Sequence, residues 1–563
     1  MLAPRPHTPE TVDPEEVSPT GPYRAVKQFG LILLCAAWVA LGIAGHDPWK
    51  TEDATSIGVA AEMAESGDVV VPTLAGEPYV ARPPLVYMGG ALAIKAFAPP
   101  LKTHNAARLI VGLALAIVLL TTSLASRELN GRAFRWMPVL ILVGGVGFWD
   151  RAHVLSPELF LTVGVAIGLY GLALALRRPV AGGVVLGLGI GAAFLGRGLL
   201  GPVWLLLAAL LLPLCGSHWR NHAYAVTLAV AILVALALAL PWPLALWIRD
   251  PALFATWWQS ESLANYLPGM GGGSADPLYY LRNLLWFAWP ALPLIAWLLW
   301  LRLRGFNGGM RQPGIIVPGV LGLVILVGLL VFPESKLSNA LPLLVPMALI
   351  AALEIDSLKR GLSSALDWFG VLTFGLLAIV FWGFWIDSYV NGMSPNVARL
   401  FRDTEVGFRP SFHLGTMLAA IGLTVLWVIL VRPARRSNRR AILNWAAGVT
   451  LVWGLLTTIW LPYLDSRRSY RWTVENVAVR LPTEGCVASR NLGEAQRALF
   501  HYFAAIRTTR EELNPDHRCE ALLVQYGRLD ADPVSPEGWT ASWMGGRRGD
   551  DTERFVLYIR KPT

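Results

Sequence analysis

The stretch VAGGVVLGLGIGAAFLGRGLLGPVWLLLAALLLPLC, residues 180–215, contains one charged side chain, Arg197. On both sides of the turn Gly196-Arg197-Gly198 the sequence is apolar over nearly the length that crosses the hydrocarbon core of a bilayer, about 20 residues in a helix. The stretch therefore predicts two membrane helices joined by a tight turn. A charge between two such spans is expensive at membrane depth, so Arg197 is a functional candidate.

The rest of the chain repeats this pattern. Its 563 residues are 55% hydrophobic and 15% charged, with a mean hydropathy of +0.50, whereas soluble domains carry about 25% charged residues. The first 27 residues, rich in Pro, Glu and Thr, predict a disordered tail, and a soluble domain is expected from residue 465 on. Between them we predict thirteen membrane helices, at 29–45, 106–126, 136–150, 157–176, 180–195, 198–215, 222–248, 284–301, 313–332, 338–355, 365–387, 413–431 and 441–462.

Arginine and lysine residues gather in short breaks between these spans, which is the pattern of cytoplasmic loops. The pattern holds if the apolar stretch 85–98, which contains Lys95, lies in the outer interface instead of crossing, as does the amphipathic stretch 54–66. On this count the N-terminal tail is cytoplasmic and the domain 465–563 is periplasmic. The net charge of +9 then reflects topology, and nucleic-acid binding is not expected.

The same count assigns several polar residues to outward-facing loops. The first loop, 46–105, contains the acid pair Glu52-Asp53. A single basic residue beside a span is more often an interfacial anchor, and a single acid is usually solvated. The coincidence of so many at one interface instead predicts a site. The candidates there are Glu52, Asp53, Tyr79, Arg82, Arg151, His153, Glu158, Arg197, Glu261 and Lys336.

Five short motifs occur in an order that resembles a known family. They are Trp49-Lys50-Thr51-Glu52-Asp53, Glu62-Met63-Ala64-Glu65-Ser66-Gly67-Asp68, Gly76-Glu77-Pro78-Tyr79 with Arg82-Pro83-Pro84, Phe194-Leu195-Gly196-Arg197-Gly198, and Ser335-Lys336-Leu337 with Leu341-Pro342. This order is similar to that of bacterial GT-C glycosyltransferases of families 39 and 83, which include the lipid A aminoarabinose transferases and, more distantly, protein O-mannosyltransferases. The resemblance implies an all-α polytopic bundle of about 13 transmembrane helices, residues 28–464, with a small C-terminal extracytoplasmic α/β domain.

The resemblance also implies roles for individual residues. The family's acid at the reaction centre falls on Glu52, with Asp53 beside it. Its phosphate-binding cations fall on Arg82, Arg197 and Lys336. The chain departs from aminoarabinose transferases after the acid pair, where their arginine is replaced by Thr55 or Ser56, and in the second outward loop, where Ser156-Pro157-Glu158 replaces Asp-Pro. These departures leave the donor sugar and the acceptor open.

The expected reaction is a single inverting displacement at the anomeric carbon of a polyprenyl-phosphate sugar. Glu52, supported by Asp53 or Glu158, would accept the proton of the acceptor hydroxyl. Three fixed cations would stabilise the charge that develops on the leaving phosphate. Tyr79, Arg151, His153 and Glu261 are expected to line the cavity. No cofactor is required; a divalent metal on Glu52, Asp53, Glu158 and His153 is a minor alternative without a compact ligand spacing.

The expected partners are the polyprenyl-phosphate sugar donor, a lipid or glycan acceptor and the lipids of the bacterial inner membrane, with the protein acting as a monomer. Two other functions stay open. A flippase of lipid-linked sugars would show charges near mid-span and repeated halves, and the chain has its charges at one interface and no detectable repeat. A ligase that transfers a whole lipid-linked glycan is disfavoured by the motif order alone.

The last hundred residues alternate polar and apolar positions. They predict a small α/β domain with strands at 486–489, 521–526, 539–544 and 555–559 and a helix at 492–506. Cys486 and Cys519 both lie in this domain, and outside the reducing cytoplasm a disulfide between them is plausible. Cys35 and Cys215 lie in apolar spans, where packing explains them.

Overall fold

The computed structural model describes residues 22–563 except for 150, 262–275, 277, 332–333, 396–408, 433–436, 483–484, 516–517, 529, 531–534, 548–551 and 562–563. Most of the predicted N-terminal tail lies outside the described residues. Helix α1 begins at Pro22, so the end of that tail, residues 22–27, is helical.

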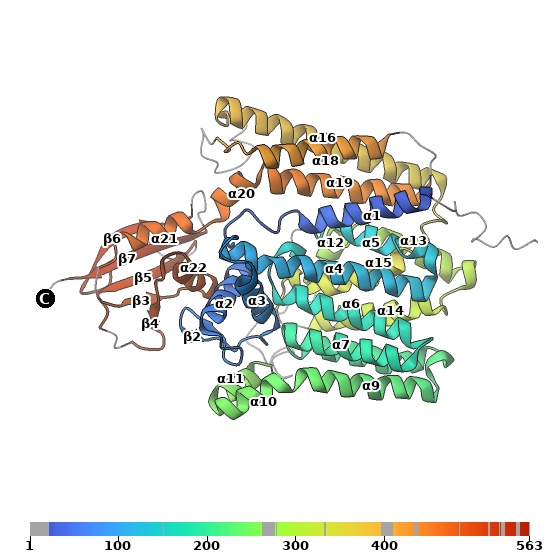
Figure 1. The fold of residues 1–563 in the computed structure, drawn as a ribbon, viewed down its shortest axis with the longest axis horizontal. Coiled ribbons are helices and arrows are strands. Elements are labelled where there is room, and N and C mark those ends of the chain that lie inside the picture. The colour runs from blue at the N-terminus through green and yellow to red at the C-terminus, as the bar shows by residue number, and fades with distance from the viewer. Residues whose placement is uncertain are drawn as a thin grey trace, which may run out of the picture.

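A bundle of helices forms the larger part of the molecule (Figure 1). Its helices are α1 Pro22–Ala40, α4 Thr103–Asn130, α5 Met137–Val143, α6 Pro157–Ala175, α7 Pro179–Arg197, α8 Leu200–Cys215, α9 His222–Ala239, α10 Pro241–Arg249, α11 Pro251–Glu261, α12 Leu278–Phe287, α13 Ala291–Leu303, α14 Pro313–Val331, α15 Leu341–Ala351, α16 Arg360–Asn391, α18 Leu414–Val431 and α19 Asn438–Thr458. Each of the thirteen predicted spans overlaps at least one of these helices; 222–248 overlaps both α9 and α10, 284–301 overlaps both α12 and α13, and α11 lies in none of them.

The predicted number of spans is not confirmed. Eight helical segments in the described residues are long and apolar enough to cross a membrane, or nine if α12 and α13, which meet at 97°, form one bent span. Helix α5 has 7 residues and α15 has 11, fewer than the roughly 20 that a straight span needs. The chain is a multi-pass membrane protein in which two of the predicted spans, those that overlap α5 and α15, are short helices buried among longer ones.

Helices α6 and α7 are in close backbone contact, and this contact brings Glu158 and Arg197 together. A Cβ added to Gly164 would lie 2.4 Å from the backbone nitrogen of Ala193, and one on Gly189 would lie 2.4 Å from that of Gly168. Small residues of this kind let membrane helices approach closely. The two helices run in opposite directions, so the beginning of α6 at Glu158 and the end of α7 at Arg197 come together.

The C-terminal part folds as a five-stranded sheet with strand order β4-β3-β5-β7-β6. Its strands are β3 Val487–Arg490, β4 Thr508–Arg510, β5 Ala521–Gly527, β6 Trp539–Gly545 and β7 Glu553–Arg560. Helix α22, Glu494–Ala504, packs on this sheet, and α20, Leu461–Arg468, and α21, Arg471–Ala478, lead into it. The four predicted strands and the helix are present, and β4 is an additional short strand that the sequence did not indicate.

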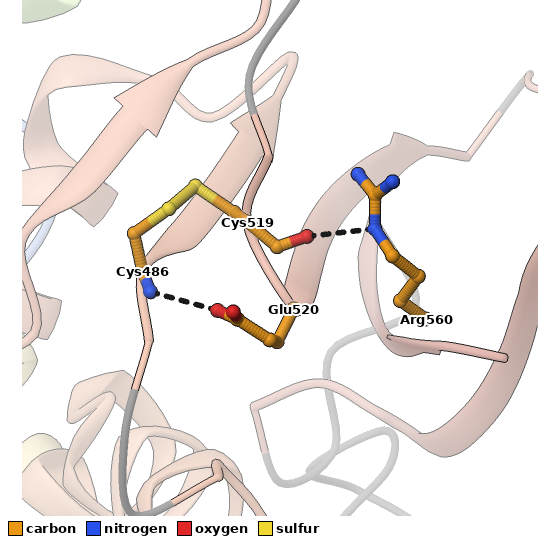
Figure 2. Close-up of a disulfide and its surroundings, with 4 residues drawn as sticks. All are labelled: Cys486, Cys519, Glu520 and Arg560. Atoms are coloured by element: carbon orange, nitrogen blue, oxygen red, sulfur yellow. Dashed lines mark hydrogen bonds between the residues drawn. A yellow bond between two sulfur atoms is a disulfide. The ribbon is translucent and has the colours of Figure 1, made fainter. Parts of the chain in front are cut away.

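Cys486 and Cys519 form a disulfide (Figure 2). Cys486 precedes β3 and Cys519 precedes β5, and these two strands are parallel neighbours in the sheet. The backbone N–H of Cys486 donates to the Glu520 carboxylate at 3.1 Å, and Arg560 Nε donates to the Cys519 carbonyl at 3.1 Å. The bond thus joins the beginnings of two adjacent strands.

Between the bundle and the sheet lie two further helices (Figure 1). Helix α2 spans Glu52–Ser66 and α3 spans Leu85–Phe97, connected through the two-stranded hairpin β1 Thr73–Leu74 and β2 Glu77–Pro78. These are the two stretches predicted as helices lying in the interface. Helix α2 packs against α3 on one side and against α22 of the C-terminal part on another, so its first turn sits where the two parts of the molecule meet.

Candidate functional site

A cavity of about 440 Å³ lies at this junction. It brings together six of the ten candidate residues, from four separate regions of the sequence. Its lining comprises Lys50, Thr51, Glu52, Thr55, Ser56, Tyr79, Arg82, Tyr87, Pro157, Glu158, Arg197, Glu334, Lys336, Asn491, Gly493, Glu494, Ala495, Gln496 and Gln525. Bundle, first loop and C-terminal domain therefore all contribute to one concave surface, which is the default location of a ligand site.

Glu52 is the first residue of α2 and lines this cavity. Its neighbour Thr51 donates a hydrogen bond from Oγ1 to Glu52 Oε2 at 2.5 Å. A carboxylate in the first turn of a helix is favoured by the partial positive charge of the free N–H groups there. The side chain is half-buried, so it remains accessible to a ligand in the cavity.

Asp53 points elsewhere, because successive residues of an α-helix are turned by about 100° from one another. It is buried and forms an ion pair with Arg108, whose Nη2 lies 2.6 Å from Asp53 Oδ2. Burial alone would raise the pKa of this carboxyl, but the charge and hydrogen bonds of Arg108 outweigh it and lower the pKa. Asp53 does not line the cavity, and its contacts are those of a structural ion pair.

Arg197 is 1% exposed and stands between two carboxylates. Its Nε lies 3.1 Å from Glu158 Oε1, and its Nη2 lies 3.3 Å from Glu334 Oε2. Its third nitrogen, Nη1, is buried and has no hydrogen-bond partner among the residues that the structure describes. Leaving a buried N–H without an acceptor costs about 1–3 kcal/mol, and more when the group is charged. An anionic ligand in the cavity would remove this cost.

Lys336 lies beside the same acid, with its Nζ 2.5 Å from Glu334 Oε1. Burial would raise the pKa of Glu334, but Lys336 and then Arg197 and Arg82 outweigh it and lower the pKa. Burial would lower the pKa of Lys336, but Glu334 outweighs it and raises the pKa. Both groups are consequently charged at neutral pH.

Arg82 completes the set of cations, with its Nη1 3.6 Å from Glu261 Oε1. The Glu261 side chain is fully buried, and its Oε2 accepts the backbone N–H of Leu199 at 3.1 Å. Glu261 is not part of the cavity lining; it lies behind Arg82 and next to the turn that holds Arg197. Tyr79 lines the cavity and donates to Glu494 Oε2 at 3.2 Å, and burial raises the pKa of its hydroxyl.

The remaining two candidates, Arg151 and His153, line a second cavity of about 360 Å³, and Asp53 lines it as well. The ring nitrogens of His153 lie 2.5 Å and 2.9 Å from the carbonyl oxygens of Trp149 and Trp38, so the ring is fixed in the wall. The Arg151 guanidinium lies 5.9 Å from the ring centre of Trp286. This cavity shares Lys50, Thr51 and Glu52 with the first, so the two spaces meet at the beginning of α2.

Sequence reasoning missed several residues of the first cavity. Glu334 stands two positions before Lys336 in the same predicted outward loop, and that spacing could have indicated it. Lys50 precedes the acid pair and could have been chosen for the same reason. No local signal indicates Asn491, Glu494, Gln496 and Gln525, because only the docking of the C-terminal domain brings them to the cavity. In the described part of the chain no group of three or more His, Cys, Asp or Glu side chains is placed to hold a metal ion.

The helical bundle with its C-terminal sheet domain has the fold of a known membrane glycosyltransferase. The solved structure of ArnT from Cupriavidus metallidurans bound to undecaprenyl phosphate superposes with a TM-score of 0.68, covering 95% of this chain and 98% of that one, at 16% sequence identity. The same ArnT in its apo state gives a TM-score of 0.66 at 15% identity. At such identities the match establishes the fold alone.

Sequence relatives point to the same class of protein, although no family model matches the chain. The chain is 28% identical over 375 residues to the undecaprenyl phosphate-alpha-4-amino-4-deoxy-L-arabinose arabinosyl transferase of Edwardsiella ictaluri. It is 27% identical over 370 residues to arabinosyl transferase 2 of that type from Pseudomonas fluorescens. The matches cover 66% and 63% of these relatives, less than two thirds of each. The predicted resemblance to GT-C glycosyltransferases, with aminoarabinose transferases among them, is confirmed.

Proposed function

We propose that this protein is an inverting glycosyltransferase that moves a sugar from a polyprenyl-phosphate donor to an acceptor of the bacterial envelope. The reaction takes place on the extracytoplasmic face of the inner membrane, with the N-terminus in the cytoplasm and residues 465–563 in the periplasm. The observation that carries the proposal is the first cavity, where the half-buried carboxylate of Glu52 shares one space with four cations. The fold and the sequence relatives support it.

In this proposal Glu52 is the general base. It accepts the proton of the acceptor hydroxyl while the acceptor oxygen forms a bond to the anomeric carbon of the donor. The bond between that carbon and the phosphate oxygen breaks in the same step, and its electron pair leaves with the polyprenyl phosphate. A single displacement of this kind inverts the configuration at the anomeric carbon. The phosphate needs no general acid, because it is already a good leaving group.

Arg82, Arg197 and Lys336 act on the leaving phosphate, which gains negative charge in the transition state. Fixed cations in a poorly hydrated cavity stabilise such charge without reorganising. Arg197 Nη1, which has no hydrogen-bond partner among the described residues, supplies a donor, and the planar guanidinium suits a phosphate oxygen pair. Glu158 serves by holding Arg197 in place, and Asp53 by holding the first turn of α2, so neither is needed as a second base. No cofactor is required.

Carboxylates lie beside the cations in this cavity, and they affect how the phosphate binds. Lys50, Arg82, Arg197 and Lys336 line the cavity together with Glu52, Glu158, Glu334 and Glu494. The phosphate must therefore share Arg197 and Lys336 with Glu334. Such sharing favours release of the polyprenyl phosphate after transfer. The acceptor, whether lipid A, another glycan or a protein, and the donor sugar stay open, because Thr55 and Ser56 depart from the pattern of aminoarabinose transferases.

The test is sugar transfer in reconstituted membranes, from synthetic polyprenyl-phosphate sugars to a panel of envelope lipids and glycans. Glu52→Gln and Arg82→Ala are compared with the wild type and with Glu65→Gln, a matched change at the exposed far end of α2. We expect Glu52→Gln to lower transfer by about 10²–10⁴-fold, the usual contribution of a general base, with Glu65→Gln unchanged. Lipid movement across the bilayer without transfer would identify a flippase instead, and full activity of Glu52→Gln would remove Glu52 as the base.

A further inference from the structure

Residues on both sides of Glu52 are held by the C-terminal domain. Asp47 is bound by Arg471, whose Nη2 lies 2.5 Å from Asp47 Oδ1. The indole N–H of Trp49 donates to Asp465 Oδ1 at 2.9 Å. Ala54 is 1% exposed and belongs to the hydrophobic core that α21, α22, β5 and β7 form. The segment that contains the proposed base is thus folded into the C-terminal domain as much as into the bundle.

One acid of that domain reaches this segment directly. Glu553, the first residue of β7, accepts a hydrogen bond from Lys50 Nζ at 2.9 Å. Its side chain is 3% exposed, whereas that of Lys50 is 32% exposed. Lys50 lies two positions before Glu52 and lines both cavities. The ion pair therefore connects the C-terminal sheet to the point where the two cavities meet.

Glu553 is also oriented by its own domain. Tyr470 donates its hydroxyl to Glu553 Oε1. Gln496 and Gln525 each donate an amide N–H to Oε2 at 3.0 Å, and Arg547 Nε lies 3.4 Å from Oε1. Both glutamines line the first cavity, so the carboxylate fixes part of the cavity wall as well as Lys50. A buried acid with this many partners has one defined orientation, which suits it to hold another group in place.

We propose that Glu553 is a positioning residue for sugar transfer, which acts by fixing Lys50 and thereby the Thr51-Glu52 turn at the junction of the two cavities. This inference rests on the proposed function. It makes the C-terminal domain part of the active site. Displacing a catalytic group by about 1 Å costs on the order of 10²-fold in rate, so loosening this turn should reduce turnover more than donor binding.

A purely structural role for Glu553 predicts something different. In that case its loss would unfold or detach the C-terminal domain, and activity would fall in proportion to the amount of folded protein. Lys50 would then contribute independently, if at all. The two roles are separated by combining the changes, because residues that act through one contact are not additive whereas independent ones are.

The experiment uses the full-length protein in reconstituted membranes and measures kcat, the donor KM and thermal unfolding. Its variants are Glu553→Gln, Lys50→Met and the two combined. The control is Glu511→Gln, which breaks the ion pair of Arg490 and Glu511 in the same domain, where Nε and Oε2 are 2.5 Å apart. Neither residue lines the first or the second cavity.

We expect each single change to lower kcat by about 10–10²-fold with the donor KM within about twofold of wild type. The double variant should be no slower than the slower single one. Glu511→Gln should keep wild-type turnover. Losses that multiply in the double variant, or a Glu553→Gln enzyme whose activity falls only as its folded fraction falls, would overturn the inference. A wild type without transfer would count against the proposed function instead.

Discussion

Two buried arginines in this molecule differ in one respect. Arg108 in α4 and Arg197 at the end of α7 are 0% and 1% exposed. Arg108 donates Nε and Nη2 to Asp53 and donates Nη1 and Nη2 to the carbonyls of His46 and Asp47, respectively. Arg197 binds two carboxylates, but its Nη1 has no hydrogen-bond partner in the described ranges. Every nitrogen of the Arg108 guanidinium donates a hydrogen bond, whereas one nitrogen of Arg197 has no acceptor among the described residues.

Whether a nitrogen lacks an acceptor distinguishes a structural arginine from a ligand-binding one better than burial or charge does. A buried arginine whose every nitrogen has an acceptor holds the backbone around it, here the segment that leads into α2. A buried cation with an unused donor facing a cavity is prepared for a ligand that brings an acceptor. The neighbouring acids Asp53 and Glu52 follow the same division, because Asp53 faces Arg108 and Glu52 faces the cavity.

The largest effect should come from breaking the satisfied pair. Asp53→Asn leaves Arg108 charged and buried without a counter-ion, which should destabilise the protein by about 3–5 kcal/mol. Thermal unfolding in detergent measures this, with Glu52→Gln, one residue away, as the control that retains wild-type stability. If the Asp53→Asn protein unfolds like wild type but transfers no sugar, Asp53 acts in the reaction and not as a structural ion-pair partner.

Arg197→Lys tests the other member of the comparison. It keeps the charge but loses the planar fork and the unused Nη1, so turnover should fall by as much as about 10²-fold, toward the loss seen when one fixed donor to a developing anion is removed. Stability should change less than in Asp53→Asn, since Lys can still pair with Glu158. Steady-state kinetics with the polyprenyl-phosphate donor reports the first quantity and thermal unfolding the second. Unchanged turnover would show that the spare donor does not touch the leaving phosphate.

Removing the acid that competes for the cations should have the smallest effect. Glu334→Gln frees Lys336 and Arg197 from a carboxylate whose pKa is lowered, so that it is charged at neutral pH. Polyprenyl phosphate should then bind about two- to fivefold more tightly, the effect of one partly exposed ion pair. Inhibition of transfer by free polyprenyl phosphate measures this, and Lys336→Met should shift the inhibition in the opposite direction. Weaker inhibition of Glu334→Gln would show that Glu334 does not compete with the phosphate.

Much of the fold followed from the sequence, because long apolar segments leave few alternatives. Four of the five strands and the helix α22 of the C-terminal domain, and the helices α2 and α3, were predicted from local pattern alone. The number of spans was not, since the 97° bend between α12 and α13 and the shortness of α5 depend on tertiary packing.

The site was predicted in part for the same reason. Glu52, Arg82, Arg197 and Lys336 come together as expected, because ordered motifs pointed to one face. The separation of Glu52 from Asp53 could not be predicted, since it requires Arg108, which at the beginning of a span reads as an anchor at the interface. The contacts of Glu553, Gln496 and Gln525 could not be predicted either. These residues lie more than four hundred positions after α2, and no local sequence pattern indicates a contact at that distance.

The contact between Lys50 and Glu553 spans 503 positions of the chain, and this has a consequence for how the protein is made. A ribosome synthesises the segment around Glu52 about five hundred residues before it reaches Glu553. Every membrane helix must be inserted before the two can meet. Under the proposed function, the carboxylate assigned as the base therefore stays in an unfinished setting until β7 has been made, and sugar transfer requires β7 to reach the same side of the membrane as α2.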